Sequence, residues 1–133
     1  MSQALILLVL TVLTACTPSE SATSTPELTC SAVEAVCADR AVADTAAGPD
    51  GLNVADMGGG LVHVIHTNFM ASCCLDFEAT ATLGAERIDV AYAEVGEPCD
   101  CVCPYSMGYD ITGVPAGSYT VWAGGASAAL IVE

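Results

Sequence analysis

The spacing of the cysteines constrains the fold of this chain more than any other sequence feature. Cys99, Cys101 and Cys103 alternate with other residues, which in a β-strand puts them on one face with successive Cα atoms about 6.6 Å apart. Cys73 and Cys74 are adjacent, so in a strand they point to opposite faces and reach different partners. We therefore expect β-structure whose neighbouring strands are tied through sulfur.

The rest of the second half of the chain also predicts β-structure. Residues 73–83 alternate apolar side chains with Asp, Glu and Thr, the pattern of a half-buried strand. Strands are expected at 61–69, 73–83, 88–95, 99–111, 119–123 and 128–132, separated by Gly- and Pro-containing turns, with Gly58-Gly59-Gly60 as a flexible break. The expected fold is mainly β, a single antiparallel sandwich of about six strands.

A short N-terminal helix is the one helical element that the sequence suggests. Ser31-Ala32-Val33-Glu34 fits a capping box, and Ala-rich sequence continues to Ala47 before Gly48-Pro49. A helix over about 32–47 would hold Cys30 and Cys37 about 10 Å apart along its axis, whereas a disulfide needs Cα atoms within roughly 7 Å. We favour a Cys30–Cys37 disulfide with the helix starting later.

The N-terminus has the pattern of an export signal. Residues 4–13 are apolar apart from Thr11 and, as a helix, span about 15 Å, half a bilayer core, which fits a signal-peptide core. Leu13-Thr14-Ala15-Cys16 resembles the bacterial lipobox, which implies that residues 1–15 are removed and that Cys16 receives lipid. Residues 16–27 are expected to be a flexible tether. By the same resemblance, Thr17 after the lipidated Cys implies the outer membrane of a Gram-negative bacterium.

Two further resemblances concern the remaining residues, divided into an N-terminal segment with a Cys pair at 28–60 and a Cys-rich β core at 61–133. The segment 111–121, with its Gly-Val-Pro-Ala-Gly turn and Tyr-Thr-Val strand, resembles Ig-like and prealbumin-like bacterial β-sandwich modules, which implies that fold. The core is similar to small Cys-rich bacterial lipoproteins for which no activity is established. The matching positions are His66, Cys73, Cys74, Cys99, Cys101, Cys103, Gly117 and Tyr119.

Charge and missing motifs exclude several function classes. The chain has 16 acidic and two basic residues, for a formal net charge of −14, so it has no basic surface with which to bind nucleic acid. The same charge disfavours binding to anionic lipid headgroups. The sequence contains no nucleophile elbow, phosphate loop or Cys-x-x-Cys motif, and we predict no catalytic activity and no catalytic residues.

The cysteines are therefore the main candidates for chemistry. The cysteines of an exported chain normally form disulfides. With the predicted lipidation site Cys16 set aside, seven of the eight cysteines remain, and this odd number leaves one sulfur outside any internal pair. We expect Cys73 and Cys74 to pair with two of the three later cysteines. The seven candidates for disulfides are Cys30, Cys37, Cys73, Cys74, Cys99, Cys101 and Cys103.

Two functions remain open at this point. The first is a lipid-anchored, disulfide-stabilised cell-envelope protein with a binding or structural role, no cofactor, and the membrane as its partner. The alternative is an envelope protein that binds Zn or Cu with soft thiolate ligands. Its candidate ligands are Cys73, Cys74, Cys99, Cys101, Cys103 and His66.

Overall fold

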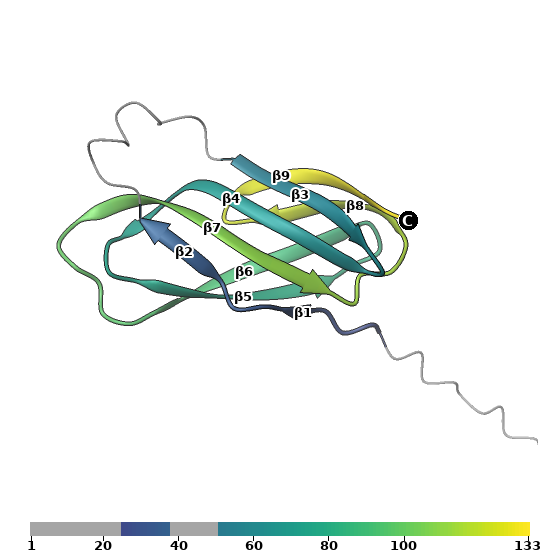
Figure 1. Ribbon diagram of the computed structural model, residues 1–133, viewed down its shortest axis with the longest axis horizontal. Helices are drawn as coiled ribbons and strands as arrows, with labels where there is room; N and C mark the ends of the chain where they lie inside the picture. The colour runs from purple at the N-terminus through teal and green to yellow at the C-terminus, as the bar shows by residue number, and fades with distance from the viewer. Residues whose placement is uncertain (1–24, 38–50) are drawn as a thin grey trace, which may run out of the picture.

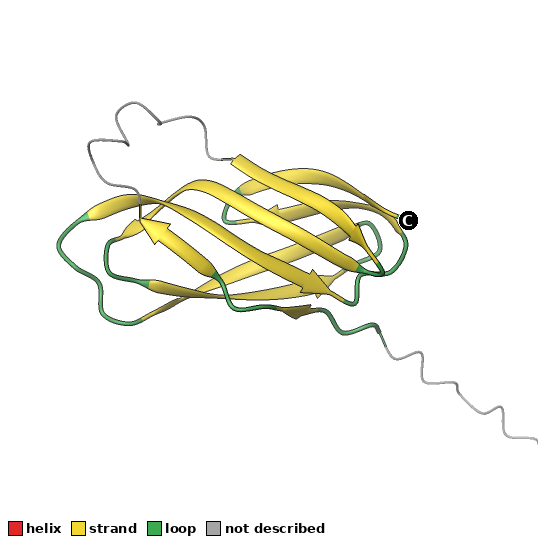
Figure 2. Ribbon diagram, in the orientation of Figure 1, coloured by secondary structure: helices red, strands yellow, loops and turns green. Residues whose placement is uncertain are grey.

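Strands make up most of the structure, a computed structural model that describes residues 25–37 and 51–133 (Figures 1 and 2). Within these residues no helix occurs and nine strands follow one another along the chain. They are β1 (Thr29–Cys30), β2 (Glu34–Cys37), β3 (Gly51–Gly58), β4 (Leu61–Ser72), β5 (Asp76–Leu83), β6 (Arg87–Val95), β7 (Val102–Thr112), β8 (Gly117–Ala123) and β9 (Ala126–Val132).

The strands form two sheets that lie one over the other (Figure 1). The first sheet has the order β1-β7-β4-β3, with β2 pairing with β7 beyond the end of β1. The second sheet has the order β5-β6-β8-β9. All pairings are antiparallel except β6 with β8, which run parallel because the chain passes through β7 in the other sheet between them.

The core lies between the sheets, because alternate residues of each strand face inward. Val62 and Ile111 from the first sheet and Ile88 and Val121 from the second are fully buried in one apolar cluster. A second, smaller cluster occupies the end of the molecule where β7 begins. It contains Ala71, Leu75, Phe77, Cys103, Tyr105 and Met107.

The mainly β prediction is confirmed, but six strands was too few. The six expected strands correspond to β4 to β9, while β1, β2 and β3 were missed. The triglycine segment, predicted to be a flexible break, ends β3 with Gly58 and forms the turn to β4 with Gly59 and Gly60. All three glycines there have positive φ angles of 87°, 64° and 79°, and the Gly58 amide donates to Asp56 Oδ1 at 2.9 Å.

Within the described residues the predicted helix is wrong, since residues 34–37 form the extended strand β2. The reason is tertiary: β2 completes its backbone hydrogen bonding against β7, with Glu34 opposite Gly108. Ser31, predicted to cap a helix, instead accepts a hydrogen bond from the Asp110 amide through Oγ at 2.9 Å. Residues 38–47 of the predicted helix lie outside the described residues.

Most of the predicted leader also lies outside the described residues. This holds for the signal peptide at 1–15, for the lipidation site Cys16 and for the tether up to residue 24. In the portion that the structure does describe, no helix combines the length and the apolar character needed to cross a bilayer.

Candidate functional site

Three disulfides gather at one end of the two sheets, where β2 and β4 end and β7 begins. The bonds are Cys37–Cys103, Cys73–Cys101 and Cys74–Cys99, with Cα–Cα distances of 5.9, 5.4 and 5.6 Å. The prediction that Cys73 and Cys74 pair with two of the three later cysteines is therefore confirmed. Together these bonds tie three chain segments that are far apart in sequence.

The strands predicted to begin at Cys73 and Cys99 begin instead at Asp76 and Val102. Cys73 and Cys74 lie in the turn after β4, where Cys74 has a φ of 68°, and Cys99 and Cys101 precede β7. The backbones still meet, because the Cys73 amide donates to Cys101 O and the Cys99 amide donates to Cys73 O, both at 2.9 Å. This short ladder brings the two sulfur pairs side by side.

The expected Cys30–Cys37 disulfide is wrong. Cys30 lies opposite Ile111 and Cys37 opposite Tyr105, because β1 and β2 follow one another along the same edge of β7. Extended chain places residues seven apart about 20 Å from each other, far beyond the reach of a disulfide. Among the described cysteines, Cys30 is the free one and Cys37 joins the cluster instead.

Two of the disulfides are close enough for their sulfurs to form a compact group. The Sγ atoms of Cys37, Cys73 and Cys103 all lie within 4.8 Å of one another, and we call this group the sulfur triangle. Cys103 is buried, Cys73 is half-buried and Cys37 is exposed. The triangle is therefore backed by the core and open to solvent on one side.

The six predicted metal ligands are not brought together as one set. Cys74 and Cys99 bond to each other and are not part of the triangle, while Cys37, which was not predicted as a ligand, is. His66 is fully buried, and its Nδ1 hydrogen-bonds to the Tyr92 hydroxyl at 3.0 Å. The Tyr92 hydroxyl lies 2.8 Å from that of Tyr109, so His66 belongs to a polar network inside the core.

The free thiol of Cys30 lies on β1, half-buried between the sheets. Burial raises the pKa of this thiol, and a weaker opposing effect comes from the hydrogen bond of the Ala81 backbone. Because the thiolate is the reactive form, such a thiol is a poor nucleophile near neutral pH.

We accordingly predict that Cys30 reacts with iodoacetamide at least about 10-fold more slowly in the native protein than in denaturant without reductant. The reason is that folding both shields the sulfur and disfavours its thiolate. The rate can be followed by mass spectrometry of the alkylated product at pH 7 and 25 °C. Equal rates in the two conditions would contradict the placement of Cys30.

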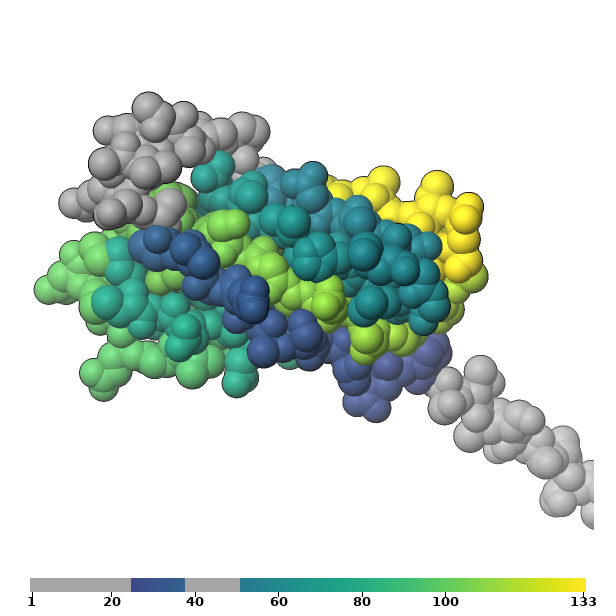
Figure 3. All heavy atoms as spheres, viewed as in Figure 1, coloured from purple at the N-terminus to yellow at the C-terminus, as the bar shows by residue number. Residues whose placement is uncertain are grey.

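The outer face of the first sheet carries a groove of about 570 Å³ over β7, distinct from the sulfur triangle. Gly108 has no side chain, which leaves a hollow between Glu34 and Val36 on β2 and His63 and Ile65 on β4. Figure 3 shows this face, with β2 lying against the green strand β7 and the teal strand β4 beyond it. The lining thus combines ionisable groups with exposed apolar side chains.

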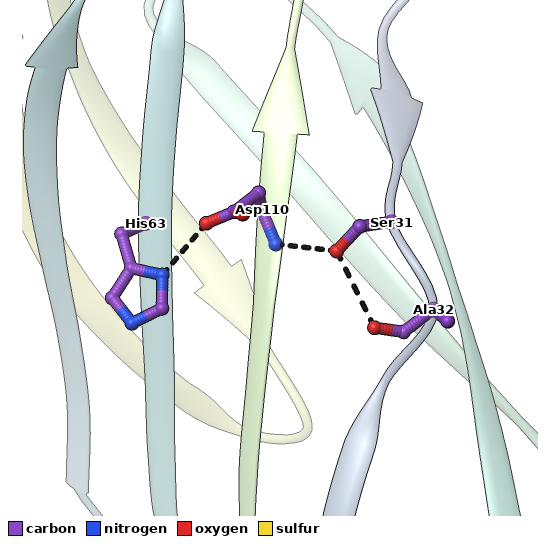
Figure 4. A network of polar contacts seen from close by, with 4 residues as sticks. All are labelled: Ser31, Ala32, His63 and Asp110. Atoms are coloured by element: carbon purple, nitrogen blue, oxygen red, sulfur yellow. Dashed lines mark hydrogen bonds and ion pairs between the residues drawn. The ribbon is translucent and has the colours of Figure 1, made fainter.

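Figure 4 shows the polar end of the groove. Nδ1 of His63 lies 2.7 Å from Oδ1 of Asp110, and both side chains are about two-fifths exposed. Ser31 Oγ accepts from the Asp110 amide at 2.9 Å and donates to Ala32 O at 3.3 Å. Because Ser31 bonds to main-chain atoms and not to His63, the three residues do not form a Ser-His-Asp catalytic triad.

Sequence reasoning missed this pair, since His63 and Asp110 are 47 residues apart and meet only through the β4–β7 register. No local motif marks either residue. Once the register is known, His63 and Asp110 are directly opposite each other, and a cross-strand hydrogen bond between their side chains follows.

Comparisons with known proteins found no matching family model, no similar curated protein and no similar solved structure.

Proposed function

We propose that this chain is a lipid-anchored cell-envelope protein with a binding or structural role and no catalytic activity. Its fold would be an Ig-like or prealbumin-like sandwich. The observation that carries the proposal is the set of three disulfides at one end of the sheets. Disulfides of this kind persist in oxidising compartments such as the bacterial periplasm and the cell surface.

The proposed anchor is a lipid on Cys16, within the lipobox-like sequence Leu13-Thr14-Ala15-Cys16. Multiple acyl chains hold a protein to a membrane without a spanning helix. The described chain begins at Thr25 and reaches β1 at the end of β7 remote from the disulfides (Figure 1). A tether at residues 16–27 would then attach to the opposite end of the domain from the sulfur triangle, on the outer membrane.

The groove over β7 supports a binding role better than a catalytic one. Its carboxylates, Glu34 and Asp110, and its exposed apolar side chains, Val36 and Ile65, are recognition groups. The hydroxyl of Ser31 is held by main-chain partners and not by a base, so the groove has no activated nucleophile.

Metabolic labelling with an alkyne fatty acid tests the anchor. In a bacterial host, the parent protein should take up label and fractionate with membranes. The Cys16→Ala variant should lose the label, and the Cys30→Ala variant, which removes another cysteine that forms no disulfide, should keep it. Equal labelling of all three proteins, or an unlabelled parent with fully reduced thiols in the cytoplasm, would contradict the proposal.

A further inference from the structure

The sulfur triangle brings together cysteines from three separate segments of the chain. Cys37 ends β2, Cys73 follows β4 and Cys103 lies in β7. We propose that the reduced form of the protein binds one Zn²⁺ ion, or a similar thiolate-binding ion, at Cys37, Cys73 and Cys103, with Cys101 as the fourth ligand. This site goes beyond the lipid-anchored role and differs from the ligand set that the sequence predicted.

Reduction would leave the sulfurs of the triangle close to the spacing of a zinc–thiolate site. Zn–S bonds of about 2.3 Å in a tetrahedron place the sulfurs about 4 Å apart. The bonded Cys37 and Cys103 sulfurs are about 2 Å apart and would separate by about 2 Å after reduction to reach this spacing, while Cys73 Sγ already lies within 4.8 Å of both. Cys101 Sγ is bonded to Cys73 Sγ, so after reduction it starts next to the other three.

The surroundings also suit a metal ion. Cys103 is 3% exposed and sits on the second apolar cluster, whereas Cys37 is exposed, which gives an ion access from one side only. Sulfur-only ligands select Zn²⁺ and other soft ions over Mg²⁺ or Ca²⁺. Among the described residues, this triangle is the group in which three potential ligand atoms lie this close together.

The chemistry requires reduction first, because a sulfur in a disulfide is not a thiolate ligand. Two equivalents of a dithiol would supply four electrons and four protons, convert Cys37–Cys103 and Cys73–Cys101 into four thiols, and leave as two disulfides. The ion then displaces the thiol protons to solvent. A third equivalent would reduce Cys74–Cys99 in the same way, and its two thiols would add no ligand to the site.

The bound ion would connect the same three segments that the two disulfides connect. The site would thus be closed in the oxidised protein and open to metal in the reduced protein, with β2 held to β4 and β7 in both states. Reduction without metal would remove the covalent link and leave β2 held by its pairing with β7 and by the packing of Ala35 on the second apolar cluster.

The test uses the full chain in detergent, reduced with a phosphine under nitrogen, then titrated with Zn²⁺ and, separately, with Co²⁺ as a spectroscopic probe. We expect one equivalent of each ion to bind, with the intense visible bands of tetrahedral Co²⁺–thiolate, and no binding to the oxidised protein. Added Zn²⁺ should also raise the melting temperature of the reduced protein.

Two matched variants, each lacking one disulfide pair, locate the site. Cys37→Ala/Cys103→Ala should bind Zn²⁺ at least about 100-fold more weakly, because two direct ligands are lost and even outer-shell changes cost 10–100-fold. Cys74→Ala/Cys99→Ala should bind as the parent does. Equal affinity in both variants, loss confined to the second, or a reduced parent that binds no Zn²⁺ in any folding state would overturn the proposal.

Discussion

Replacing Cys37 and Cys103 together with alanine is expected to lower the free energy of unfolding by about 4 kcal/mol. This disulfide joins residues 66 positions apart. When the neighbouring Cys73–Cys101 bond is intact, the shortest covalent path from Cys37 to Cys103 runs through it, so the Cys37–Cys103 bond closes a loop of about 40 residues. The chain-entropy relation gives about 4 kcal/mol for a loop of that size. The loss is measured by urea unfolding under non-reducing conditions.

The Cys74→Ala/Cys99→Ala protein is the matched control and should lose only about 2 kcal/mol. Its disulfide is nested inside Cys73–Cys101, which already holds the same two segments together. Removing the inner bond therefore reopens a loop of only about four residues. If the control lost as much stability as the Cys37/Cys103 variant, the entropy of loop closure in the unfolded chain would not explain how these disulfides stabilise the protein.

This contrast depends on a pairing that the sequence only partly indicated. Because Cys73 and Cys74 are adjacent and Cys99, Cys101 and Cys103 alternate, the sequence predicted that the first two would bond to two of the other three. The bond between Cys37 and Cys103 could not be predicted, because it follows from β2 pairing along the edge of β7. Local signals favoured a helix there, with Ser31 and Glu34 in capping positions, and the pairing with β7 overrode them.

The later strands were predictable because their alternation is strict. Residues 88–95 and 119–123 fall within β6 (Arg87–Val95) and β8 (Gly117–Ala123), where buried side chains such as Ile88 and Val121 alternate with exposed ones. β3 was missed because Asn53, Asp56 and the following glycines weaken its apolar pattern. The groove and the sulfur triangle depend on register between distant strands, which no local pattern encodes.

The core hydrogen-bond network is another product of register, since Tyr92 on β6 meets His66 on β4 and Tyr109 on β7. Its hydroxyl lies 3.0 Å from His66 Nδ1 and 2.8 Å from the Tyr109 hydroxyl, so it is the middle member of the network. The Tyr109 side chain is almost fully buried, at 2% exposure. Both neighbours therefore hydrogen-bond to Tyr92 inside the buried core.

We predict that Tyr92→Phe lowers the free energy of unfolding by about 2–3 kcal/mol, because it removes a hydrogen-bond partner from two buried polar groups. Tyr109→Phe should cost only about 1 kcal/mol, since Tyr92 keeps its bond to His66. Urea unfolding at pH 7 measures both changes. A smaller loss for Tyr92→Phe than for Tyr109→Phe would show that Tyr92 is not the centre of the network.

The same network predicts a sensitivity to alkaline pH. Burial, and to a lesser extent the hydrogen bond with Tyr92, raises the pKa of Tyr109 well above its ordinary value. The folded protein therefore retains a proton on Tyr109 that the unfolded chain releases at about pH 10. The contribution of Tyr109 to the free energy of unfolding is fully present below that pH and is lost progressively as the pH rises above it. Between about pH 9 and 11, the parent should therefore lose stability more steeply than Tyr109→Phe, as measured by urea midpoints at each pH. Parallel pH profiles for the two proteins would mean that Tyr109 ionises as easily in the folded state as in the unfolded chain.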